Sequence, residues 1–106
     1  MVHRLIVQYG QPTDPAEFDR HYREVHVPLV QAVPGLLRFT VGHPRSMDRS
    51  TPAPYAIAEL DFESAEAMGE ALSTEAGRAT SADVPTFASG GVSMASFDVD
   101  DVTSAG

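Results

Sequence analysis

His26 is the residue whose type and position point most directly to chemistry. It belongs to the sequence HVPL at residues 26–29, and Pro28 lacks the N–H that a helix interior needs, so we expect the helix to kink or end there. Counted from Phe18 at about 100° per residue, His26 lies about 80° round the helix, at the edge of the apolar stripe. From that edge an imidazole can reach a cavity between helix and sheet, where it could donate or accept a proton or anchor a substrate oxygen. The alternative is a structural histidine that bonds a nearby carbonyl, such as the one that Pro28 leaves unpaired.

Glu59 is the second candidate, because it lies in the middle of an otherwise apolar strand. A carboxylate in such a place is costly unless it is paired. One interpretation is a catalytic carboxylate in the cavity, where it would orient His26. The other is an ion pair with Arg4 or Arg38 on neighbouring strands, or exposure at the edge of a dimer. Asp61, further along the same strand, is expected to be solvated.

Aromatic residues supply candidates for binding a ring-shaped substrate, namely Tyr9, Tyr22, Phe39 and Tyr55. Aromatic side chains also dominate ordinary hydrophobic cores, so a purely structural role is the alternative for all four.

The sequence gives little support for a metal ion or an organic cofactor. It has no cysteine, which removes thiolate metal sites and cysteine nucleophiles. His21 and His26 are five residues apart, or about 140° on a regular helix, so they cannot chelate one metal ion there. His3 and His43 have no carboxylate neighbours at a ligand spacing. Because Walker, GxGxxG, GxSxG and HExxH sequences are also absent, we expect neither a metal nor a nucleotide cofactor.

Length and charge limit the possible functions. The chain has 106 residues and a formal net charge of −8, with 15 acidic against 7 basic residues. Nucleic acids and anionic membranes are bound mainly through Lys and Arg, so neither is an expected partner. No stretch has the length and apolarity of a membrane span, and the start of the sequence lacks the apolar core of a signal peptide. These features predict a soluble cytoplasmic protein with a single domain over residues 1–98 and an acidic, flexible tail over residues 99–106.

Hydrophobic patterning predicts the elements that position these residues. Strands are expected over residues 4–9, 36–41, 55–62 and 92–97, and a long loop over 42–54. The first helix begins at Asp14, a capping residue, and its expected apolar stripe consists of Phe18, Tyr22, Val25 and Leu29. A second helix begins at Ser64; we expect Gly77 to interrupt it and Pro85 to end it.

The order βαββαβ is that of the ferredoxin-like fold, an α+β fold with a four-stranded antiparallel sheet and two helices on one face. Several expected strands are apolar on both faces, as in the neighbouring pairs Leu5 and Ile6, Leu36 and Leu37, and Ile57 and Ala58. A sheet face open to water would carry polar residues instead. The pattern therefore predicts a homodimer in which the sheet faces of two copies pack together.

The sequence also resembles the EthD-like family, which is named for ethyl tert-butyl ether degradation. The resemblance lies in residues 18–29, 33–36, 54–62 and 82–92, and so covers nearly all of the chain except the tail. It implies a dimeric α+β barrel with a cavity in each subunit and no cofactor motif, although relatives are often labelled reductases. His26 matches the family's HxP histidine, the usual candidate for acid–base chemistry, and Glu59 matches an acidic position of the third strand. The resemblance gives His21 no role.

The sequence leaves more than one function open. The first is a cofactor-independent enzyme, of an oxidoreductase or isomerase type, that acts on a small cyclic or aromatic compound in catabolism or secondary metabolism, with His26 moving a proton. The second is a non-catalytic protein that binds a small molecule for a degradation pathway. A structural dimer without a ligand is the third reading.

Overall fold

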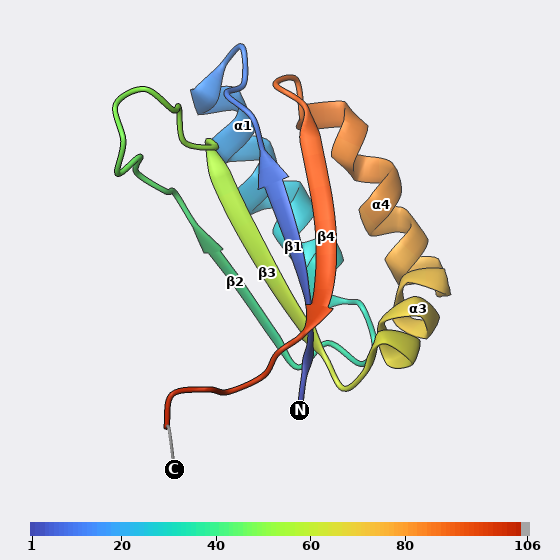
Figure 1. The fold of residues 1–106 in the computed structure, drawn as a ribbon. Coiled ribbons are helices and arrows are strands. Elements are labelled where there is room, and N and C mark those ends of the chain that lie inside the picture. The colour runs from blue at the N-terminus through green and yellow to red at the C-terminus, as the bar shows by residue number, and fades with distance from the viewer. Residues whose placement is uncertain (105–106) are drawn as a thin grey trace.

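The protein is a single antiparallel sheet with helices on one of its two faces, as a computed structural model describes it for residues 1–104 (Figure 1). The strands are β1 (His3–Tyr9), β2 (Arg38–Gly42), β3 (Ala56–Phe62) and β4 (Val92–Asp98), in the spatial order β2-β3-β1-β4. Every neighbouring pair is antiparallel, and β1 and β3 are the central strands. This is the ferredoxin-like α+β fold that the order of elements predicts.

The first helical column consists of three consecutive segments: α1 (Pro15–His21), a π-helical turn η1 (Tyr22–His26) and α2 (Val27–Gln31). It begins where the sequence indicates, because the Asp14 carboxylate accepts the Glu17 backbone N–H at 3.2 Å and Pro15 occupies the first turn. The column does not end at Pro28 as one interpretation allowed. The helix widens before this proline, where the Val27 N–H bonds the Tyr22 carbonyl five residues back, and it continues beyond it.

The π-turn changes which residues of this column are buried. The expected stripe is correct for Phe18 and Tyr22, but it is wrong for Val25, which is 38% exposed. The next buried residues are His26 and Val30. A turn with i→i+5 bonds holds an extra residue, so the buried face moves by one position relative to a regular α-helix. His26 thus lies in the middle of the buried face rather than at its edge.

The second helical region consists of α3 (Ala65–Ser73) and α4 (Glu75–Phe87). The Ser64 hydroxyl caps α3, as expected, and the Thr74 hydroxyl caps α4. The break therefore falls at Thr74 and not at Gly77, where we expected it. Pro85 also lies inside α4, which continues to Phe87 and does not end at this proline as we expected.

The hydrophobic core lies between the helices and one face of the sheet. Alternate residues of the two central strands point into it, which confirms the predicted faces of both strands. Its buried members are Val7, Tyr9, Phe18, Tyr22, Val30, Val33, Ala56, Ala58, Leu60, Phe62, Ala71, Val84 and Phe87.

The opposite, open face of the sheet is only partly apolar. Strand β2 begins at Arg38, so Leu36 and Leu37 precede it and are not the two faces of a strand, as we had expected. The expectation that Asp61 is solvated is also wrong: it is 7% exposed and accepts two hydrogen bonds from Arg4, at 2.7 and 3.0 Å. The Arg4 guanidinium holds the pKa of Asp61 below its ordinary value, against the opposing effect of burial.

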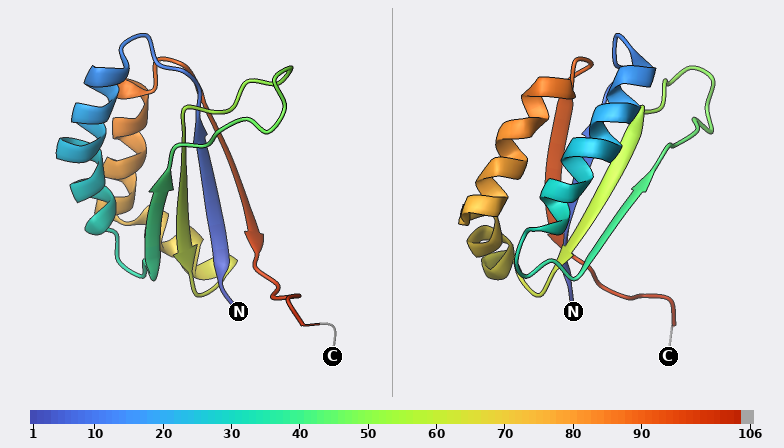
Figure 2. Two further views of the ribbon diagram at one scale, coloured as in Figure 1. Left: turned by 90° about the vertical axis from the view of Figure 1, so that its left-hand side faces the viewer. Right: turned by 180° about the vertical axis from the view of Figure 1, so that it is seen from behind.

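The long loop between β2 and β3 and the C-terminal segment both extend on the open side of the sheet, away from the helices (Figure 2, left). Residues 99–104 have no regular secondary structure, although the Val99 N–H still bonds the Val2 carbonyl at 2.8 Å. The last two residues of the expected tail, 105–106, lie outside the described residues. No helix in the described part of the chain is both long and apolar enough to cross a membrane.

Candidate active site

A small cavity of about 60 Å³ lies inside the core between the helices and the sheet. Its walls are mostly apolar and come from all four strands, the first helical column, α3 and α4. Three of the four aromatic residues predicted to bind a substrate line it: Tyr9, Tyr22 and Phe39. The other lining residues are Leu5, Val7, His26, Val30, Ala58, Leu60, Leu72, Thr80, Ser81, Val84 and Met94.

His26 brings the ionisable chemistry to this cavity. Its side chain is 4% exposed, and its Nδ1 lies 2.9 Å from an Oδ atom of Asp83 on α4. Among the described residues the only side-chain hydrogen bond of the ring is this one at Nδ1, so its other nitrogen, Nε2, is not engaged. One ring nitrogen of His26 is therefore held by the Asp83 carboxylate, and the other is free to meet a molecule in the cavity. The carboxylate fixes the orientation and tautomer of the ring, which is what a histidine needs in order to exchange protons with a substrate.

Asp83 is shared by two histidines. His21 Nε2 lies 2.9 Å from the second carboxylate oxygen of Asp83, and the Thr86 hydroxyl lies 3.0 Å from that same oxygen. The expectation that His21 and His26 point about 140° apart is wrong, because the helix between them is not regular. The i→i+5 bonding of the π-turn places residues five apart on the same side of the column.

The charges of this group can be assigned from its environment. Burial acts to raise the pKa of Asp83, but hydrogen bonds from His21, His26 and Thr86 outweigh it and hold that pKa below its ordinary value. Asp83 is thus ionised and accepts a hydrogen bond from His26 Nδ1–H. Burial lowers the pKa of His26, although the hydrogen bond to Asp83 opposes this shift. At neutral pH His26 is therefore uncharged, with the lone pair on Nε2 available as a base.

Two phenols stand beside this base. Burial raises the pKa of Tyr9 to about 12 and also raises that of Tyr22, so both are neutral hydroxyls at physiological pH. Tyr22 is 7% exposed, and its hydroxyl makes no hydrogen bond of good geometry within residues 1–104, although it lies close enough to the Tyr9 hydroxyl for each to shift the pKa of the other. A buried phenol without a partner costs free energy, which a ligand oxygen in the cavity would recover.

Glu59 does not meet His26. It alternates along β3 with Ala58 and Leu60, which line the cavity, so its side chain lies on the open face of the sheet. There it pairs with Arg4 at 3.5 Å, as the alternative interpretation held. The carboxylate that orients His26 is Asp83, which sequence reasoning missed. The one available signal was an acidic residue within the 82–92 segment that carries the family resemblance.

Tyr55 also lies away from the cavity. Its hydroxyl donates a hydrogen bond to Asp19 at 2.7 Å, and its ring packs on that of His43. It borders a shallow surface hollow beside the loop between β2 and β3. Its hydroxyl is thus already paired within the protein.

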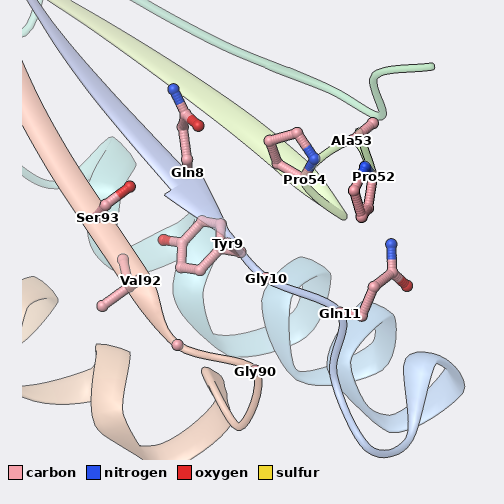
Figure 3. A pocket seen from close by; sticks show the side chains of 11 residues that line it. Gln8, Tyr9, Gly10, Gln11, Pro52, Ala53, Pro54, Gly90, Val92 and Ser93 are labelled. Carbon is pink, nitrogen blue, oxygen red and sulfur yellow. The ribbon is translucent and has the colours of Figure 1, made fainter. Parts of the chain in front are cut away.

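A surface hollow of about 460 Å³, larger than the inner cavity, lies at the end of the sheet, where the β1 terminus, the long loop and the α4–β4 turn meet (Figure 3). Gln8 and Ser93, which are partners in the strand register, stand on its open side, whereas the Tyr9 ring points away toward the helices. Its remaining walls are glycine, proline, alanine, valine and glutamine. With no acid or base on its accessible side, it does not offer the proton chemistry of the inner cavity.

Metal binding has no support from the side-chain arrangement. In the part of the chain that the structure describes, no group of three or more His, Asp or Glu residues could hold a metal ion. His21 and His26 each form a hydrogen bond to Asp83 through one ring nitrogen.

The fold and this site define a class: a ferredoxin-like α+β protein with an internal, largely apolar cavity and a buried histidine–aspartate pair. Within that class, residues 10–91 match the EthD domain, and the chain belongs to the EthD family. This confirms the resemblance that the sequence shows.

Relatives agree with this assignment. An uncharacterized 11.0 kDa protein from the thcB–thcC intergenic region of Rhodococcus erythropolis is 45% identical over 101 residues, which cover 95% of this chain and 98% of that one. An ethyl tert-butyl ether degradation (EthD) family protein of Bacillus halodurans has a TM-score of 0.87 and 28% identity, and the match covers 94% of this chain and 100% of that one.

Two more distant solved structures share the fold at 14% identity. One is a dimeric ferredoxin-like protein of unknown function from Thermobifida fusca, with a TM-score of 0.70 and coverage of 93% of this chain and 92% of that one. The other is SnoaB, a cofactor-independent oxygenase from Streptomyces nogalater, with a TM-score of 0.66 and coverage of 95% of both chains.

Proposed function

We propose that this protein is a small cofactor-independent enzyme that acts on a small cyclic or aromatic compound, with His26 as the proton acceptor and donor. The observation that carries the proposal is the cavity-lining His26, which is fixed at Nδ1 by an ionised carboxylate and free at Nε2. The fold similarity to SnoaB supports the class, because that protein is an oxygenase that works without a cofactor.

The residues can perform one chemical operation together. Nε2 of His26 removes a proton from an acidic O–H or C–H group of a bound compound, and the positive charge that forms on the ring is stabilised by Asp83 across the Nδ1–H bond. The Tyr22 hydroxyl is placed to donate a hydrogen bond to the oxygen on which negative charge develops. Return of the proton from Nε2 to another atom of the compound completes an isomerisation and restores the neutral histidine.

The alternative function, a protein that binds a small molecule without reaction, would use the same cavity. Its apolar walls would hold a small molecule whether or not His26 reacts with it, so ligand binding by itself does not distinguish the two functions. Turnover and its dependence on pH do distinguish them.

The test is a turnover screen of small cyclic and aromatic compounds with the purified protein and no added cofactor. For an active compound, kcat/KM should rise with pH through the pKa of His26, because only the neutral imidazole accepts a proton. That rise should centre below the ordinary histidine value of 6.5, since burial lowers this pKa. Compounds that bind at the cavity without any turnover would replace the enzyme assignment with the binding protein.

We also propose that the active form is a homodimer in which the open faces of two sheets pack together. Ile6, Ile57, Ala95 and Phe97 share this face, and Phe97 is 48% exposed in the single chain. A second copy would cover these apolar groups, and the open face is free of helices to allow it (Figure 2). The relative from Thermobifida fusca, which is described as dimeric, supports this assembly.

Light scattering at micromolar concentration is expected to give twice the chain mass of 11.3 kDa. The Phe97→Glu variant should lower the measured mass toward that of one chain, because it replaces an apolar side chain of the proposed interface with a charged one. Val25→Glu is the matched control: Val25 is also apolar and partly exposed, but it lies on the helices, so the dimer should survive. A monomeric wild-type protein would refute the sheet-to-sheet assembly.

A further inference from the structure

The inner cavity reaches the surface at one place. Twelve of its fourteen lining residues are buried or half-buried, and the two exposed ones are Ser81 on α4 and Met94 on β4. Met94 pairs with Val7 in the strand register, so its side chain lies on the helix side of the sheet. The opening is therefore between β4 and α4, with the 55% exposed Met94 at its rim.

The Met94 side chain at this rim can change conformation, whereas the side chains of the rest of the cavity wall are fixed by packing. Val7, Ala58 and Leu60 belong to the two central strands and are at most 5% exposed, so they are held on all sides. Methionine is unbranched, has three rotatable side-chain bonds and changes shape at little cost. Met94 also lies on an edge strand that is exposed along its whole length.

The cavity must widen to hold a ring. Its volume of about 60 Å³ is well below the roughly 150 Å³ of an engineered cavity that binds benzene. Turning Met94 outward is the change that adds space without disturbing a buried side chain. Since Met94 is on the helix side, a dimer through the open face leaves this entrance free.

The walls also determine the charge of the ligand. No Asp, Glu, Lys or Arg side chain lines the cavity, and His26 is neutral. Burying an unpaired ionic group there would cost several kcal/mol, and the net charge of −8 opposes the approach of an anion. The hydroxyls of Thr80 and Ser81 already donate to helix carbonyls at 2.9 and 3.2 Å.

From these observations we infer that the ligand is an uncharged ring compound with one hydroxyl or carbonyl oxygen, and that it enters past Met94, whose side chain limits the size of ring admitted. The oxygen binds at Nε2 of His26 and the hydroxyl of Tyr22, beside the hydroxyl of Tyr9; none of these three polar atoms of the cavity makes a hydrogen bond of good geometry within the described residues. The inference rests on the proposed function for the role of the cavity, and adds to it the entrance and the charge of the substrate.

The test uses phenol and benzoate at pH 7, which have one ring each but differ in charge. Phenol is expected to shift the NMR signals of the His26 ring and the Met94 methyl group, while the methyl of Met47, in the long loop and fully exposed, stays unchanged. Benzoate should bind about tenfold more weakly or not at all, because its carboxylate would be buried without a partner. Equal binding of benzoate at the cavity would overturn the assignment of a neutral ligand.

Substitutions at the rim test the entrance. Met94→Ala is expected to tighten phenol binding or speed its association, and Met94→Trp to weaken it, each by about tenfold, the usual effect of changing the shape of a pocket. Met47→Ala is the matched control and should bind as the wild type does. If phenol shifts His26 but all three variants bind alike, the entrance lies elsewhere while the proposed function stands. If neither ring compound perturbs His26, the cavity is not the binding site and both proposals fail.

Discussion

His26→Asn is expected to lower turnover by about 10²-fold or more, while the protein keeps its fold and loses only the ligand affinity that the hydrogen bond at Nε2 supplies. Asparagine can still donate a hydrogen bond to Asp83, so the buried carboxylate is not left without a partner. It cannot accept a proton at the position of Nε2. The larger part of the loss should therefore appear in kcat, as expected for a group that acts in the transition state, and the smaller part in affinity.

Two further variants show which carboxylate supports His26. Asp83→Asn should cause a smaller loss than His26→Asn and should add little to it in the double variant, because the two residues act as one unit. Glu59→Gln is the control, because it removes one negative charge as Asp83→Asn does. Glu59 lies on the other face of the sheet, so its substitution should leave turnover unchanged. If His26→Asn instead loses about 1–3 kcal/mol of stability and retains full activity, His26 is a structural residue, and the binding-protein function becomes the better one.

Gly77→Ala is expected to destabilise the fold by about 2 kcal/mol or more, against the usual preference for alanine in helices. Gly77 lies in the first turn of α4, where the chain has just turned from α3. A Cβ there would lie 2.6 Å from Leu72 Cα and would collide with the carbonyl of Ala71. Both contacts are with backbone atoms of the preceding helix, which cannot move aside without separating the two helices.

Gly69→Ala supplies the matched comparison. Gly69 lies in the middle of α3 and nothing stands within 4 Å of the position that its Cβ would take. Helix propensity alone should then operate, and the substitution is expected to stabilise the protein by about 1 kcal/mol. Urea unfolding of both variants measures the two free energies. If both alanine substitutions gave a similar gain in stability, the close packing of α3 against α4 at Gly77 would be disproved.

Gly77 also shows where local sequence reasoning reaches its limit. A glycine in a helical stretch predicts a break at that residue, but here the break is at Thr74, which supplies the capping hydroxyl for the next helix. Gly77 is needed because another helix approaches it. Such a requirement depends on the distance between two elements, and residue preferences along one segment do not contain that distance.

The sequence by itself determined the order of the strands and helices, the start of α1 at Asp14 and of α3 at Ser64, and the residues of β1 and β3 that face the core. These features depend on interactions within a few residues, on capping and on the two-residue period of a strand, all of which can be read along the chain. His26 could be selected as a candidate for the same reason, because proline two residues later marks an unusual place in a helix.

Only the tertiary structure decided how His26 is used. The π-turn from Tyr22 to His26 turns the imidazole into the core and brings His21 to the same side, since its i→i+5 bonding shifts the helix out of its regular phase. Asp83 reaches His26 from a helix 57 residues further along the chain, whereas Glu59, the candidate carboxylate of the sequence, lies on the opposite face of the sheet. Both carboxylates are chemically able to orient a histidine, and the choice between them was made by the packing of α4 against the first helical column on one face of the sheet.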